Sequence, residues 1–187
     1  LGAIKTWTGA QIGEIKDIMA GIPVEEIKDI TRQAFKDALK TLGAVTNWSE
    51  KQLAALKVQL VAAFGAVETW TADTGAKIGT LAAALNDSEV AKMSKAAVKA
   101  AIDASQVALG KAKVKATALL KKAAESEVYG KVQDWTVANV NALGALAGDV
   151  LGDKVKDLSD ATFKATAAVL ADVKDWSAKQ RKDLAAK

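Results

Sequence analysis

Hydrophobic residues recur three and four positions apart along most of the chain, with polar residues between them. In the first third, Ile12, Ile15, Ile18 and Ile22 follow this spacing. Residues spaced in this way lie on one face of an amphipathic helix. Together with Ser, Thr and Gly at the expected boundaries, the pattern predicts three helices in this part of the chain, over 9–20, 24–42 and 50–63.

The same pattern returns twice along the chain. Trp7, Trp70 and Trp135 are each followed by threonine, and the second interval between them is slightly longer than the first. We therefore predict about three repeats of about 64 residues and three helices each, namely 1–63, 64–128 and an incomplete 129–187. The helices predicted in the second and third units are 72–84, 88–108, 112–127, 137–149, 153–174 and 178–187.

Each tryptophan precedes a residue suited to start a helix. Capping-box spacing, a Ser or Thr with Gln three positions later, pairs Thr8 with Gln11 and Ser49 with Gln52. The tryptophan then stands where it would pack as a hydrophobic staple on the fourth helical residue, although Trp70 finds only Gly75 there. A ligand cage or carbohydrate platform is the less favoured alternative. The residues given this staple-and-cap role are Trp7, Thr8, Gln11, Trp48, Ser49, Gln52, Trp70, Thr71, Trp135, Thr136, Trp176, Ser177 and Gln180.

Glycines mark several expected helix ends. Gly65 and Gly130 follow an apolar residue at the end of a predicted helix, and Gly43 follows Leu42 in the same way. A left-handed residue after the last helical turn is commonly glycine. We expect all three to adopt that conformation.

Composition supports an all-α fold and argues against catalysis. Half of the residues are hydrophobic, Pro23 is the sole proline, and cysteine and histidine are both absent. Disulfides, the usual zinc ligands and the commonest general base are thereby excluded. The carboxylate pairs Glu25 with Glu26 and Asp153 with Asp157 lie among lysines on polar helix faces. We expect a non-enzymatic protein without cofactor or metal.

The net charge of +4 comes almost entirely from lysine, because only Arg32 and Arg181 are arginines. Readers of nucleic acid use arginine forks, so no nucleic-acid partner is expected. No stretch approaches the roughly 20 apolar residues of a transmembrane helix. One segment without acidic residues is a candidate polyanion contact, or else a solvated helix face; its lysines are Lys111, Lys113, Lys115, Lys121 and Lys122.

Two N-x-Ser triplets offer glycosylation sites at Asn47 and Asn86, both in predicted loops between helices. The alternative is that Ser49 and Ser88 are present as helix caps. Intact-mass measurement before and after glycosidase treatment separates the two interpretations.

The order of motifs resembles a known family. An aromatic residue, Ser or Thr, a Gln three positions later and spaced Ile or Leu, as in Trp7-Thr8…Gln11…Ile15, is similar to the helical repeats of the mesothelin, stereocilin and otoancorin superfamily. The resemblance implies an armadillo-like, right-handed superhelix (an α-solenoid), secreted or at the cell surface, and a role in adhesion or matrix attachment. This chain departs from typical members in lacking cysteine and in its Ala and Lys content.

Two functions remain open. The leading expectation is an extracellular structural or adhesive protein that associates with itself, as a homo-oligomer or filament, or attaches to matrix or glycan. The alternative is an amphipathic helical protein that binds lipid or another surface. Because the repeat register is incomplete at both ends, we expect the chain to be a segment of a longer array.

Overall fold

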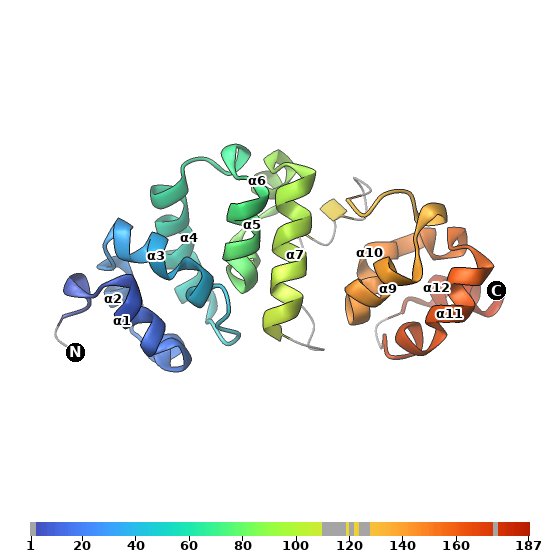
Figure 1. Cartoon of the computed structure of the whole chain (residues 1–187), viewed down its shortest axis with the longest axis horizontal. Helices are drawn as coiled ribbons and strands as arrows, with labels where there is room; N and C mark the ends of the chain where they lie inside the picture. Colours follow the sequence, from blue (N-terminus) through green and yellow to red (C-terminus); the bar gives the residue numbers. More distant parts are fainter. Residues whose placement is uncertain (1–2, 110–118, 120–121, 124–127, 174–175) are drawn as a thin grey trace.

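The computed structural model describes residues 3–109, 119, 122–123, 128–173 and 176–187. Within these residues, helix is the only regular secondary structure, which confirms the all-α prediction. Figure 1 shows the helices following one another in chain order along the long axis, with the two termini at opposite ends. Each group of helices therefore contacts mainly the groups before and after it in the sequence.

The first predicted unit contains shorter helices than its hydrophobic pattern indicates. The expected helix 9–20 is α-helical only to Glu14 and continues as a 3₁₀ helix. The expected helix 24–42 is interrupted because Thr31 is extended and caps a new helix through the amide of Ala34. The observed elements are η1 (Ile4–Thr6), α1 (Gly9–Glu14), η2 (Lys16–Gly21), α2 (Val24–Lys28), α3 (Arg32–Leu42) and α4 (Glu50–Phe64).

The second predicted unit shows the same divisions, whereas the third adds an α-helix at Ala147–Leu151 and has a 3₁₀ helix, Gly152–Asp157, where the first unit has α2. A 3₁₀ helix again follows the first α-helix, and an extended residue again divides the long second one. The predicted helix 112–127 lies mostly outside the described residues. The observed elements are η3 (Val67–Thr69), α5 (Ala72–Ile78), η4 (Gly79–Ala84), α6 (Asp87–Lys92), α7 (Lys95–Leu109), η5 (Val132–Asp134), α9 (Val137–Leu143), η6 (Gly144–Leu146), α10 (Ala147–Leu151), η7 (Gly152–Asp157), α11 (Asp160–Ala171) and α12 (Ala178–Ala185).

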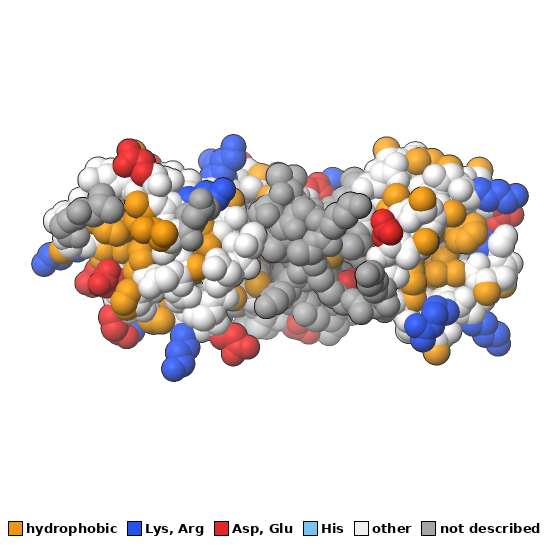
Figure 2. Space-filling view, turned by 90° about the horizontal axis from the view of Figure 1, so that it is seen from below, with side chains coloured by type: hydrophobic (Ala, Val, Ile, Leu, Met, Phe, Trp, Pro, Cys, Tyr) orange, Lys and Arg blue, Asp and Glu red, His pale blue; other side chains and the backbone are white. Residues whose placement is uncertain are grey.

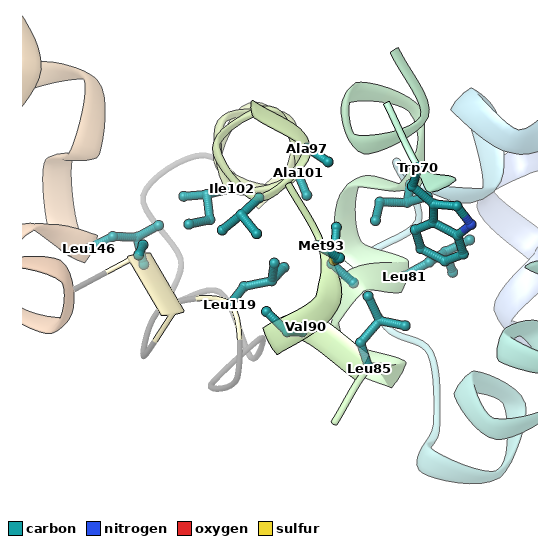
Figure 3. Packing of buried hydrophobic residues seen from close by; sticks show 14 of the residues in the cluster. Trp70, Leu81, Leu85, Val90, Met93, Ala97, Ala101, Ile102, Leu119 and Leu146 are labelled. Atoms are coloured by element: carbon teal, nitrogen blue, oxygen red, sulfur yellow. The ribbon is translucent and has the colours of Figure 1, made fainter. Parts of the chain in front are cut away.

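A cluster of buried apolar side chains extends from Ile4 to Trp176. Figure 3 shows its central part, where Leu81, Leu85 and Met93 pack near Trp70. Leu119 lies between this group and Leu146 of the third unit. The cluster therefore links side chains from all three predicted units.

Close helix packing explains Gly75, the residue that leaves Trp70 without a staple partner. A Cβ at Gly75 would overlap the backbone of Ala97 in α7. A Cβ at Gly9 of α1 would overlap the Cβ of Asp37 on α3 and come within 3.2 Å of the carbonyl oxygen of Ala34. Ala34 holds in the first unit the position that Ala97 holds in the second. A glycine therefore lets α1 approach α3 closely and α5 approach α7 closely, although the glycine stands at a different repeat position in each unit.

Gly43 also owes its place to close packing, and the prediction of a left-handed conformation there is wrong. Its φ is −68°, whereas Gly65 and Gly130 have the predicted positive values of 77° and 81°. A Cβ at Gly43 would overlap the carbonyl oxygens of Lys77 and Ile78. The backbones of the first two units meet at this point.

Replacing Gly75 with alanine tests this packing. The added methyl group meets the Ala97 backbone, so we expect Gly75→Ala to lower the free energy of unfolding by about 2 kcal/mol. Gly21→Ala is the matched control, because no atom lies within 4 Å of a Cβ there, and a change under about 0.5 kcal/mol is expected. Urea unfolding followed by circular dichroism measures both, and equal effects would contradict the interpretation.

Candidate functional site

The residues predicted to cap helices do so. Thr8, Ser49 and Ser177 each accept a hydrogen bond from the amide three residues later, and the Gln there accepts one from the cap amide in return. Thr136 forms the same box with Asn139 rather than Gln. Thr71 caps the amide of Thr74 only. These contacts satisfy amides at the helix starts that have no intrahelical partner.

Two of the capping glutamines also bind distant backbone. Gln52 uses its side-chain oxygen in the box, and its Nε2 donates to the carbonyl oxygens of Ala20 and Ile22 at 2.8 and 2.9 Å. Gln180 donates likewise to Gly148 and Gly152, at 2.9 Å each. Both side chains are buried. Gln52 therefore joins the start of α4 to the end of η2. Gln180 joins the start of α12 to α10 and to the start of η7.

The tryptophans are anchored by their indole N–H groups, a contact that the staple hypothesis did not include. Trp70 and Trp135 donate to the carbonyl oxygen five residues earlier, on Gly65 and Gly130, at 3.1 Å. Trp48 and Trp176 donate to the carbonyl six residues earlier, at 3.2 and 3.0 Å. The acceptors of that second pair, the carbonyls of Leu42 and Leu170, belong to the last turns of α3 and α11.

The indole bond explains why Trp70 is in place without a staple partner. Its side chain is only 3% exposed, although its predicted partner is Gly75. The glycine five residues before Trp70 and before Trp135 was the available sequence signal, because it marks the helix end whose carbonyl the indole reaches. The staple contacts of the other tryptophans stay a prediction.

Another donor recurs at one repeat position near the end of each predicted unit. Gln59 Nε2 donates to the carbonyl oxygen of Lys28 at 2.8 Å. In the second unit Lys122 takes the place of Gln59, and its Nζ donates at 3.0 Å to the carbonyl of Ala91, the counterpart of Lys28. Lys187 Nζ donates to Leu158 at 2.7 Å. The side chains differ, but each supplies an N–H group to the end of the second helical stretch.

This bond changes the interpretation of the lysine-rich segment. Lys122 serves an internal contact, whereas Lys111, Lys113, Lys115 and Lys121 lie outside the described residues. A polyanion contact at those four lysines stays a prediction.

The same bond fixes the repeat register in the second unit. Gln59 and Lys122 are separated by the same interval as Trp7 and Trp70, whereas the interval from Phe64 to Tyr129 is longer. The extra residues of the second unit therefore fall after Lys122 and before Tyr129.

The first and second units meet through polar contacts, which we call the first joint. Thr80 donates its amide and its hydroxyl to the carbonyl of Gly43, at 2.8 and 3.0 Å. Lys57 on α4 pairs with Glu89 on α6 at 3.0 Å, and both side chains are largely covered. Because the pair is partly shielded from water, its attraction is stronger than that of an exposed pair.

Tyr129 lies between the second and third units. Its hydroxyl donates to Asp103 of α7 at 2.8 Å, and Lys99 lies 5.0 Å above its ring. Trp135 packs edge-on at 6.1 Å between ring centroids. Burial, and then the adjacent Asp103 carboxylate, raise the pKa of the Tyr129 phenol well above its usual range. The corresponding pair in the first unit is Lys36 over Phe64, at 5.8 Å.

The candidate glycosylation sites differ in their surroundings. Asn47 is exposed between α3 and α4. Asn86 is itself the N-cap of α6, accepting from the Glu89 amide at 3.0 Å. The expectation that Ser88 provides this cap is therefore wrong. Glycosylation at either asparagine stays a prediction.

One carboxylate of each pair considered for acid-base chemistry lies in an exposed ion pair. Glu25 pairs with Lys28 at 2.9 Å and Asp153 with Lys179 at 2.7 Å; the bond to Asp153 raises the pKa of Lys179. Among the described residues, no three acidic side chains are grouped so as to hold a metal ion. Nor does that part of the chain contain a helix long and apolar enough to cross a membrane.

Comparison with known proteins gives no relative. No family model, curated protein or solved structure matches this chain. Function must therefore be argued from the caps, the recurring donors and the joints.

Exchanging glutamine for glutamate tests the long-range role of the cap. In Gln52→Glu the new carboxylate retains an acceptor for the Ser49 amide but faces two carbonyl oxygens, so we expect a loss of about 3 kcal/mol in the free energy of unfolding near neutral pH. Burial raises the folded-state pKa of the introduced carboxyl, so the loss should shrink as the pH falls and that group is protonated. Gln11→Glu, in an exposed box, is the control and should stay within about 0.5 kcal/mol of the parent. Chemical unfolding at several pH values measures this, and equal losses in the two variants would refute the long-range role.

Alkaline titration tests the environment of Tyr129, the sole tyrosine of the chain. Its raised pKa means that its contribution to stability is fully present below the unfolded value of about 10 and is lost as the pH rises above it. We expect phenolate absorbance to appear only together with unfolding. Tyr129→Phe should lack the signal and lose less stability at high pH. A smooth titration near pH 10 in the folded protein would contradict the assignment.

Proposed function

We propose that this chain is a non-enzymatic structural or adhesive protein of the extracellular space, built as a right-handed superhelical array of about three units of about 64 residues. Its proposed partners are other copies of itself and extracellular matrix or glycan. The similarity of its motifs to the mesothelin, stereocilin and otoancorin repeats supports the same proposal.

The observation that carries the proposal is the recurrence of one donor contact at the repeat spacing. Gln59, Lys122 and Lys187 each bind a backbone carbonyl 29 to 31 residues earlier. The first two contacts agree in register at both donor and acceptor, and the third agrees at the donor while its acceptor lies two positions further along the chain. This recurrence supports stacking of like units. Such a stack offers extended faces to a partner, and the polar atoms named above are used to hold helices together. This use of its polar groups suits a structural role.

The lipid-binding alternative requires tryptophans that can reach a membrane. Trp70, Trp135 and Trp176 are instead buried and hydrogen-bonded to the backbone. Transferring them to lipid would break those bonds and open the core. This cost favours the structural proposal over the alternative.

Light scattering over a range of concentrations, with negative-stain microscopy, tests self-association, and retention on immobilised matrix tests attachment. We expect the mass to rise with concentration or the protein to be retained. A monomer at every concentration that is not retained would refute the proposal. Tryptophan emission on adding phosphatidylserine-containing vesicles is the companion measurement, and it should not shift. A blue shift would favour the lipid alternative.

A further inference from the structure

The first unit exposes an apolar face whose counterparts in the second and third units are buried. Ile18 is 63% exposed, and Ile15 and Ile22 beside it are only partly buried. A single exposed isoleucine is ordinary on a protein surface. Ile18, however, corresponds to Leu81 and Leu146 in the repeat register, and these are 0% and 1% exposed. Figure 2 shows hydrophobic side chains gathered over the helices of this end of the molecule.

The first joint shows what covers this position. Leu81 belongs to η4, which packs against α4 of the preceding unit. An ion pair flanks the contact, with Lys57 on the covering helix and Glu89 on the covered unit. The surface that fits the apolar face is therefore the last helix of another unit, with basic residues on the covering side.

The first unit keeps the acidic partner of that ion pair. Glu26 holds in the first unit the position that Glu89 holds in the second, and it is exposed on α2 next to Glu25. The apolar face and an acidic helix thus lie together, as they do on the second unit in the first joint. The first unit therefore has the apolar face and the acidic helix that are covered in the second unit, but no described residue covers them.

The opposite end of the chain presents a complementary surface. Helix α12 carries Arg181 and Lys182, both exposed, beside Lys179, which is paired with Asp153. Ala185 stands where α4 has Lys57, so the basic charge on α12 lies at other positions. On α11, Lys164 and Ala171 are exposed at the positions that correspond to Lys36 of α3 and to Gly43, which follows α3. Small side chains permit close approach, and the basic helix matches the acidic α2 in charge.

We propose that the face formed by Ile15, Ile18 and Ile22 binds the α11–α12 end of a second copy of this chain, head to tail. The proposal rests on the proposed self-association and names its surfaces. Such a contact joins different patches on the two copies, so it propagates into a filament or ring. It is not an identical copy of the first joint, because Lys16 and Ala171 carry side chains where Gly79 and Gly43 touch.

Substitution of the exposed isoleucine tests the surface. Ile18→Lys places a charge in the contact and should raise the dissociation constant of self-association at least about tenfold. Val58→Lys is the matched control, because Val58 is 66% exposed on α4 and lies outside the proposed contact. Sedimentation velocity measures both variants, and circular dichroism verifies that each is folded.

Cross-linking tests the direction of assembly. The chain has no cysteine, so Glu26→Cys and Ala185→Cys introduce unique thiols at the positions corresponding to Glu89 and Lys57. With a short bis-maleimide, the double variant should give a ladder beyond the dimer. Pairing Ala185→Cys with Val58→Cys is the control and should not.

Each outcome decides the proposal. Loss of association in Ile18→Lys alone, together with the ladder, supports it. Association that survives Ile18→Lys overturns it and leaves self-association through another surface. A wild-type chain that stays monomeric overturns it together with proposed self-association. The proposal is also overturned if the parent chain binds phosphatidylserine vesicles in place of a second copy and Ile18→Lys abolishes that binding.

Discussion

Short helices leave a large share of their backbone amides and carbonyls without intrahelical partners. The α-helices in the described part of the chain run from 5 to 15 residues. Their terminal amides and carbonyls therefore require hydrogen-bond partners at many points along the chain. Side chains meet it at both ends of the helices: Ser, Thr and Asn cap the starts, while indoles, glutamines and lysines bind carbonyls at the ends. The way successive helices are held against one another depends on where these side chains find their acceptors.

The local part of this scheme could be predicted from the sequence. A capping box needs only two residues three positions apart, so Thr8 with Gln11 and Ser177 with Gln180 were found from spacing alone. The positive φ of Gly65 followed from its place after a helix. In each case the cause lies within a few residues of the effect.

The remainder depends on residues far away in the sequence. Nothing in the neighbourhood of Gln52 indicates that its nitrogen binds Ala20 and Ile22. Gly43 was assigned a turn conformation because its approach to Lys77 and Ile78 is invisible locally. Hydrophobic spacing also passes unbroken through Thr31, where the structure starts a new helix. Lys122 replaces Gln59 by a different residue type but keeps a hydrogen-bond donor at that position. Comparison of residue types alone therefore understates the similarity of the units.

The reach of these side-chain bonds has a consequence for folding. Bonds that join separate helices, such as Ser105 to Gly79 and Thr80 to Gly43, close loops of 26 to 37 residues. The entropy of closing a loop grows with the logarithm of its length, and chains dominated by nearby contacts fold quickly. Adding units to such a plan lengthens no loop. The entropic cost of closing each loop then depends on the length of that loop and not on the length of the whole chain.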